Sequence, residues 1–247
     1  MATYELRPLG VGEILDRGVG IYRGHFAILL AIAAVCQGPA AVVRLYVALG
    51  GGALVHPLAF LVALLLGSFG YFLAAGATLR VISQAYLGSE PVLGDALGFA
   101  WRKMWPLLVA GFASNLVMVL AMLLLIVPGI IVACGYAVVS QVVVLEEPKR
   151  STDALSRSWA LTKGFKGQAF FLGFVALVIL SLPSLAVAML LRSAPELGSA
   201  VNELVSLLLR PILTCAFTLF YYDLRVRKEA FDLDLLGQQI GVGASTA

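Results

Sequence analysis

Six long apolar runs, separated by short polar segments, dominate the chain. They lie near residues 26–49, 57–82, 105–127, 128–145, 168–191 and 200–222. A helix needs about 20 predominantly apolar residues to cross the hydrocarbon core of a bilayer, and each run is close to that length or above it. The pattern therefore predicts six transmembrane helices.

The third and fourth runs are continuous through Val127, Pro128 and Gly129. One helix over both runs would be far longer than a bilayer is thick. Because proline cannot continue the helical hydrogen-bond ladder and glycine accepts a bend, we expect a tight turn at this tripeptide. The six spans then form three hairpins.

The polar segments that precede the three hairpins resemble one another. Each opens with a small or hydroxyl residue and an acid, at Gly12-Glu13, Gly94-Asp95 and Thr152-Asp153, and each continues to a leucine and then to basic residues. Acids at the start of a helix and bases at its end suit the helix dipole, and apolar positions at helical spacing suit a helix on a membrane surface. We predict three repeats, near 11–82, 93–145 and 151–222, each an amphipathic interfacial helix followed by two spans.

The predicted fold class is all-α, a polytopic integral membrane protein with one six-helix domain over residues 1–236. The end of this domain, 223–236, begins basic and becomes acidic and apolar, which predicts a juxtamembrane helix. Residues 237–247 are small and polar, and we expect them to be disordered.

Composition supports this class. The 247 residues are 61% hydrophobic and 13% charged, whereas soluble domains are about 45–50% apolar and about 25% charged. A soluble body of this size would expose large apolar patches. The net charge of +3 is small and scattered, which argues against nucleic acid as a partner.

The basic residues predict the orientation in the membrane. Most Lys and Arg residues lie before the first span or after the second, fourth or sixth span. All of these segments are on the same side of the membrane if each run crosses it once. Because Lys and Arg accumulate in cytoplasmic loops, both termini are predicted to be cytoplasmic.

Motifs for catalysis are absent from the sequence. There is no HExxH, GxSxG or phosphate-binding loop, and His25 and His56 fall at opposite predicted faces of the membrane. Cys36, Cys134 and Cys215 are isolated within apolar runs, without the spacing of a metal site. We therefore predict no enzymatic activity, no catalytic residue, no metal and no cofactor.

Polar side chains at mid-membrane depth are the candidate binding residues. Arg210 lies roughly 15 Å from either end of its run, and Asn115 and Gln37 lie at similar depth. We hypothesise that these three converge on a polar site inside the bundle, with Glu203 as an ion-pair partner of Arg210. The alternative is that they form separate helix–helix hydrogen bonds, each worth about 0.6 kcal/mol. Arg44, near a span end, is interpreted as snorkelling to the interface.

Three motifs resemble a known family. They are RPLGVGEILDR at 7–17, ALSRSWALTKG at 154–164 and YYDLRVRKE at 221–229. Together they are similar to a family of bacterial and archaeal membrane proteins named after the membrane domain of glycerophosphoryl diester phosphodiesterase. The resemblance implies a location in the prokaryotic cytoplasmic (inner) membrane. In the named enzyme a separate soluble barrel performs catalysis, so we do not expect the enzymatic activity to transfer to this chain.

Two functions follow from these observations. The first is a membrane scaffold or lipid-organising module, with membrane lipids as partners and with protein partners docking on the interfacial helices. Small residues such as Gly67, Gly70 and Gly76 permit close helix approach, within one chain or in a homo-oligomer. The alternative is a small transporter or channel for a lipid-like or anionic substrate, using Arg210.

Overall fold

A computed structural model describes residues 10–52, 54–86 and 89–229. Within these ranges the chain forms nine α-helices and no strand. The helices are α1 (Val11–Gly24), α2 (Phe26–Leu49), α3 (Pro57–Tyr86), α4 (Leu93–Leu124), α5 (Ile126–Gly135), α6 (Val139–Leu145), α7 (Asp153–Thr162), α8 (Lys166–Leu190) and α9 (Pro195–Glu229).

Six helical segments are long and apolar enough to cross a membrane. Five of them belong to α2, α3, α4, α8 and α9, and the sixth, Ile126–Leu145, combines α5 and α6. The predicted all-α class is therefore confirmed for the described residues, with six apolar helices able to cross a membrane, as in a multi-pass membrane protein.

The break between the third and fourth spans lies earlier than the turn predicted at Val127-Pro128-Gly129. Leu125 is extended, with φ −161° and ψ 141°, and it separates α4 from α5. Pro128 lies in the first turn of α5, where a residue without an N–H loses no intrahelical hydrogen bond. The proline therefore helps to start the next helix instead of forming the bend.

The three predicted amphipathic segments do not all form separate helices. The first and third are α1 and α7, whereas the second is the beginning of α4, which continues through Pro106. Gly164, at φ +89°, ends the helical path between α7 and α8, but the second segment has no such break. The predicted juxtamembrane helix begins as the last turns of α9, and residues 230–247, with the predicted tail, lie outside the described part of the chain.

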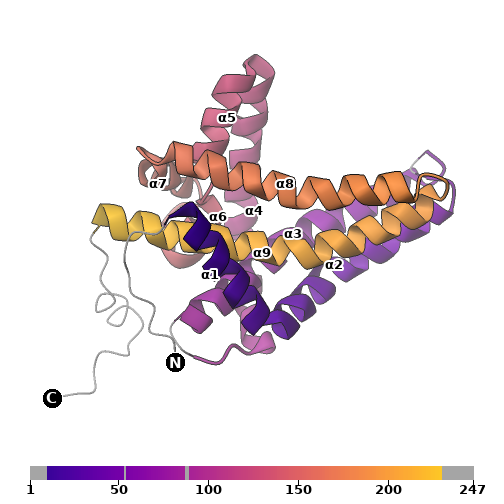
Figure 1. The fold of residues 1–247 in the computed structure, drawn as a ribbon, viewed down its shortest axis with the longest axis horizontal. Coiled ribbons are helices and arrows are strands. Elements are labelled where there is room, and N and C mark those ends of the chain that lie inside the picture. The colour runs from indigo at the N-terminus through magenta and orange to yellow at the C-terminus, as the bar shows by residue number, and fades with distance from the viewer. Residues whose placement is uncertain (1–9, 53, 87–88, 230–247) are drawn as a thin grey trace.

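The long helices point in two directions from a common base. Helices α2, α3, α8 and α9 run together toward one end, whereas α5 and the C-terminal part of α4 project in another direction (Figure 1). The contacts agree, because α9 packs against α2, α3 and α8, while α4 packs against α5. We call the first group the long arm and the second the short arm.

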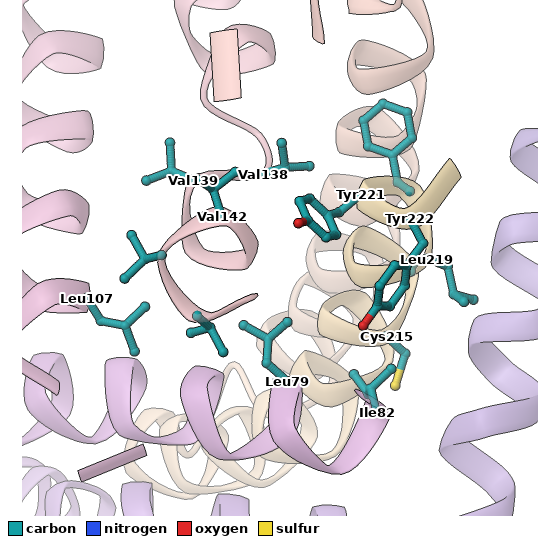
Figure 2. Close-up of a cluster of buried hydrophobic side chains, with 14 of the residues drawn as sticks. Leu79, Ile82, Leu107, Val138, Val139, Val142, Cys215, Leu219, Tyr221 and Tyr222 are labelled. Carbon is teal, nitrogen blue, oxygen red and sulfur yellow. The ribbon is translucent and has the colours of Figure 1, made fainter. Parts of the chain in front are cut away.

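The buried core lies in the base, where the arms meet. Leu79 and Ile82 of α3 and Leu107 of α4 surround the short helix α6, and Tyr221 and Tyr222 of α9 close the cluster (Figure 2). These positions are at the span ends that carry most of the basic residues. The far ends of both arms instead expose large apolar side chains, among them Leu49, Leu58, Leu123, Leu124, Ile126 and Leu190, as expected for surfaces that face lipid.

Candidate intramembrane anion site

Arg210 of the long arm contacts a polar partner on a neighbouring helix. Its Nη1 donates a hydrogen bond of 2.5 Å to Oε1 of Gln37, and Gln37 is only 4% exposed. Pro39 and Pro211 lie close to this pair, and α2 and α9 each continue through their proline. The structure thus brings together two of the residues predicted from mid-membrane depth, from positions 173 residues apart.

Among the cavities of the described residues, two are lined by Arg210. The smaller one, of about 20 Å³, also contacts Gln37, Thr78 and Tyr71, and it has room for about one water molecule. The larger one, of about 280 Å³, lies where α6 meets α3, α8 and α9. That volume is close to the lower end of the range for small-molecule sites. Arg210 therefore borders space large enough for a ligand group.

The charge of Arg210 is not neutralised by a carboxylate of the described residues. The salt bridges of this part of the chain involve other Lys and Arg residues. Gln37 supplies one neutral acceptor to a group with five N–H donors. The guanidinium group therefore keeps N–H donors that an anion could accept from.

Glu203, predicted as the ion-pair partner of Arg210, instead pairs with Arg44. The Arg44 guanidinium donates to the Glu203 carboxylate between α2 and α9. Both side chains line a separate cavity of about 380 Å³ that does not include Arg210. Arg44, which was interpreted as snorkelling to the membrane interface, therefore has a carboxylate partner within the protein. The predicted ion pair between Arg210 and Glu203 does not form, because Glu203 pairs with Arg44 instead.

Asn115 lies apart from the other predicted residues. Its amide nitrogen donates to the carbonyl oxygen of Gly111, one turn earlier in α4, at 2.8 Å. Neither cavity that Arg210 lines includes Asn115. Its side chain bonds to its own helix, so Asn115 is not part of the site that contains Arg210.

Gln141 was not singled out in the sequence, and the structure adds it to the site. It lies on α6, is 5% exposed and lines the larger cavity together with Arg210. Its Oε1 is buried and has no hydrogen-bond partner. The sequence signal is the one that identified Gln37 and Asn115, an amide inside an apolar run. Gln141 lies near the end of its run, so depth alone did not distinguish it from an interfacial residue.

A second polar cluster lies in the base. Glu146, at the end of α6, accepts hydrogen bonds from Arg157 Nε at 2.6 Å and from the Tyr221 hydroxyl at 3.0 Å, and Arg157 also pairs with Glu229. Burial alone would lower the pKa of Arg157, but its hydrogen bonds with the two carboxylates raise it above the ordinary value. This cluster holds α6, α7 and the end of α9 together. Its residues line none of the cavities described for this part of the chain.

Metal-binding geometry does not occur in the described ranges. No group of three or more His, Cys, Asp or Glu side chains is close enough there to hold a metal ion. Cys36, Cys134 and Cys215 are buried and free.

Comparison with models of protein families, with curated proteins and with solved structures finds no match to this chain.

Proposed function

We propose that this chain is a non-enzymatic membrane protein that binds and organises anionic lipid between its helices, with Arg210 as the anion-binding residue. The observation that carries the proposal is that Arg210, near the middle of a membrane-spanning helix, lines a cavity and has a neutral amide as its partner. A lipid phosphate offers the negative charge that this environment lacks.

The surroundings of Arg210 suit an amphiphile better than a free ion. Leu180, Leu213 and Phe217 line the same cavity, and the helices around it expose apolar side chains to the lipid phase. A lipid could place its phosphate beside the guanidinium group while its acyl chains remain in contact with apolar surface. A small hydrophilic anion would not gain from these walls.

The architecture proposed with this function has three spanning hairpins with cytoplasmic termini, in the prokaryotic cytoplasmic membrane. Support comes from the basic residues at the base and from the packing of consecutive long helices. The prokaryotic location rests on the resemblance of the sequence motifs to the family of bacterial and archaeal membrane proteins. In this arrangement α1 and α7 lie at the membrane surface and their outer faces can receive a protein partner.

In intact cells, an impermeant thiol reagent should label a cysteine at Val55 and not one at Ser89; the reverse pattern would invert the orientation.

Transport of a lipid-like or anionic substrate is the second candidate. The cavity of about 280 Å³ favours it, because a transported group needs space beside Arg210. Proteoliposomes distinguish the two functions: a transporter accelerates movement of a labelled anionic lipid between leaflets, whereas a binding module leaves that rate at its protein-free value.

Replacing Arg210 with glutamine tests the proposed function. We expect Arg210→Gln to weaken binding of phosphatidylmethanol, a simple anionic phospholipid, by at least tenfold, because a charge-assisted hydrogen bond contributes about 1.5–3 kcal/mol. Bound lipid is measured by native mass spectrometry of the purified protein. Arg150→Gln removes the same charge from an exposed position and should change binding by less than about twofold. Equal binding to the wild type and to Arg210→Gln would contradict the proposal.

A further inference from the structure

Asn115 is an exposed amide on the part of α4 that belongs to the short arm. It lies roughly 15 Å before the break at Leu125, within a helix that is long and apolar enough to cross a membrane. Its side chain is exposed, and none of the cavities described for this part of the chain includes it. At mid-membrane depth the amide is therefore presented to the lipid phase.

The chain uses only part of the hydrogen-bonding capacity of this amide. One N–H of Asn115 donates to the carbonyl oxygen of Gly111 at 2.8 Å. A side-chain amide also has a second N–H and an oxygen that accepts, and no group of the described residues pairs with either of them. Because acyl chains offer no hydrogen bond, a polar group exposed to them is stabilised by a polar group on another helix.

Exposed apolar side chains continue the surface around Asn115. Four of them lie along one face of α4, at spacings of four, three and four residues: Phe112, Leu116, Val119 and Leu123. Each is at least 49% exposed, so no described helix covers this face, and the short arm projects away from the long arm (Figure 1). The same spacing packs helices against one another in coiled coils. We call these four residues and Asn115 the Asn115 face.

We infer that the Asn115 face is the contact between two copies of this chain in the membrane. Two copies that insert in the same orientation have Asn115 at the same depth, and a two-fold axis along the membrane normal brings the two amides together. Each amide then donates its second N–H to the oxygen of the other, while the apolar side chains add van der Waals packing. A different membrane protein would need a polar residue of its own at the matching depth, whereas a second copy supplies one by symmetry.

The contact is separate from the anion site, so the inference goes beyond the proposed function. Neither cavity that Arg210 lines includes a residue of the Asn115 face. Loss of the contact should therefore leave the binding of anionic lipid per chain unchanged. Loss of lipid binding in Arg210→Gln should in turn leave the association of two copies unchanged.

Förster transfer between copies fused to donor and acceptor fluorescent proteins tests the association in liposomes over a series of protein-to-lipid ratios. We expect the wild type to dimerise, and Asn115→Leu to raise the dissociation constant of the dimer by about five- to tenfold, the effect of two interhelical hydrogen bonds. Asn115→Gln retains an amide and should dimerise more strongly than Asn115→Leu. A wild type that stays monomeric at every ratio, or equal dissociation constants for the wild type and Asn115→Leu, would overturn the inference.

Ser68→Leu is the matched control for Asn115→Leu. Ser68 is also exposed on an apolar helix, α3 of the long arm, and its hydroxyl donates to the carbonyl oxygen of Leu64, one turn earlier, at 2.8 Å. This bond uses the one donor of a serine side chain. Ser68→Leu should therefore dimerise as the wild type does. A loss equal to that of Asn115→Leu would overturn the special role of the amide.

Disulfide crosslinking in liposomes locates the contact on α4. Val119→Cys, in the Asn115 face, should crosslink two copies under an oxidant. Leu177→Cys is the control, since Leu177 of α8 is 62% exposed on the long arm, and it should not crosslink. The native cysteines are buried, so they add no crosslink of their own. Absence of crosslinking in Val119→Cys, or equal crosslinking in Leu177→Cys, would overturn the assignment of the contact to this face.

Discussion

Replacing Gly70 with alanine is expected to destabilise the protein more than any other single methyl group added to the long arm. A Cβ at this position of α3 would lie 2.0 Å from the carbonyl oxygen of Cys36 and 2.9 Å from its carbonyl carbon, both in the backbone of α2. Backbone atoms cannot move aside as a flexible side chain can, so α2 and α3 would have to separate. We expect a loss of about 3 kcal/mol in the free energy of unfolding and a Tm lower by roughly 6–12 °C.

Gly38→Ala is the control for this substitution. Gly38 lies on α2, the same helix that Gly70 approaches, but a Cβ there would have no neighbouring atom within 4 Å. Alanine at that position should leave the Tm equal to that of the wild type or raise it slightly, since alanine is the better helix former. Thermal unfolding of the three purified proteins in one detergent makes the comparison. Equal Tm values for Gly70→Ala and Gly38→Ala would contradict the close approach of α2 and α3.

Replacing Glu146 with glutamine is expected to weaken the base. Glu146 accepts two hydrogen bonds from Arg157, at 2.6 and 3.2 Å, and one from Tyr221 at 3.0 Å. Its side chain is 17% exposed, so solvent replaces these contacts poorly. Loss of the carboxylate charge leaves Arg157 with Glu229 as its remaining anionic partner. We expect a cost of about 2 kcal/mol and a Tm lower by roughly 4–8 °C.

The neighbouring residue supplies a matched control for Glu146. Glu147 also pairs with a cation, Lys103, but its side chain is 61% exposed. An exposed salt bridge contributes about 1 kcal/mol or less, so Glu147→Gln should lower the Tm by much less than Glu146→Gln does. The Tm of both variants is measured by thermal unfolding followed by intrinsic fluorescence. Trp159 of α7, two residues after Arg157, supplies part of the signal. A larger effect at Glu147 would mean that the cluster does not hold the base together.

The spans could be predicted from the sequence because length and hydropathy alone determine whether a helix can cross a bilayer. The first predicted run, 26–49, has the bounds of α2, and the other runs differ from their helices mainly at the ends. Those differences arise from local backbone geometry. The polar segment that begins α4 continues into the span because no residue such as Gly164 interrupts the helix. The hydrophobic pattern alone does not predict whether such an interruption occurs.

The sequence also predicts a mid-membrane depth for Arg210, since each helical residue adds 1.5 Å, but it does not predict the partners of Arg210. Contacts across helices depend on which helices adjoin and how each is rotated. Two residues at equal predicted depth, such as Gln37 and Asn115, can face different neighbours: Gln37 contacts Arg210 and Asn115 contacts its own helix. Glu203 is on the same helix as Arg210 but faces Arg44 of α2. The orphaned oxygen of Gln141 is likewise a property of packing, which no single-residue signal reveals.

The central claim is that Arg210 faces a space that an anionic lipid occupies. The most direct measurement is an experimentally determined structure of the full chain in nanodiscs that contain phosphatidylglycerol. We predict headgroup density in the cavity formed by α3, α6, α8 and α9, with a phosphate oxygen within hydrogen-bond distance of the Arg210 guanidinium group. A structure in which the cavity is filled by side chains, and in which Arg210 forms a salt bridge with a carboxylate of its own chain, would contradict the claim.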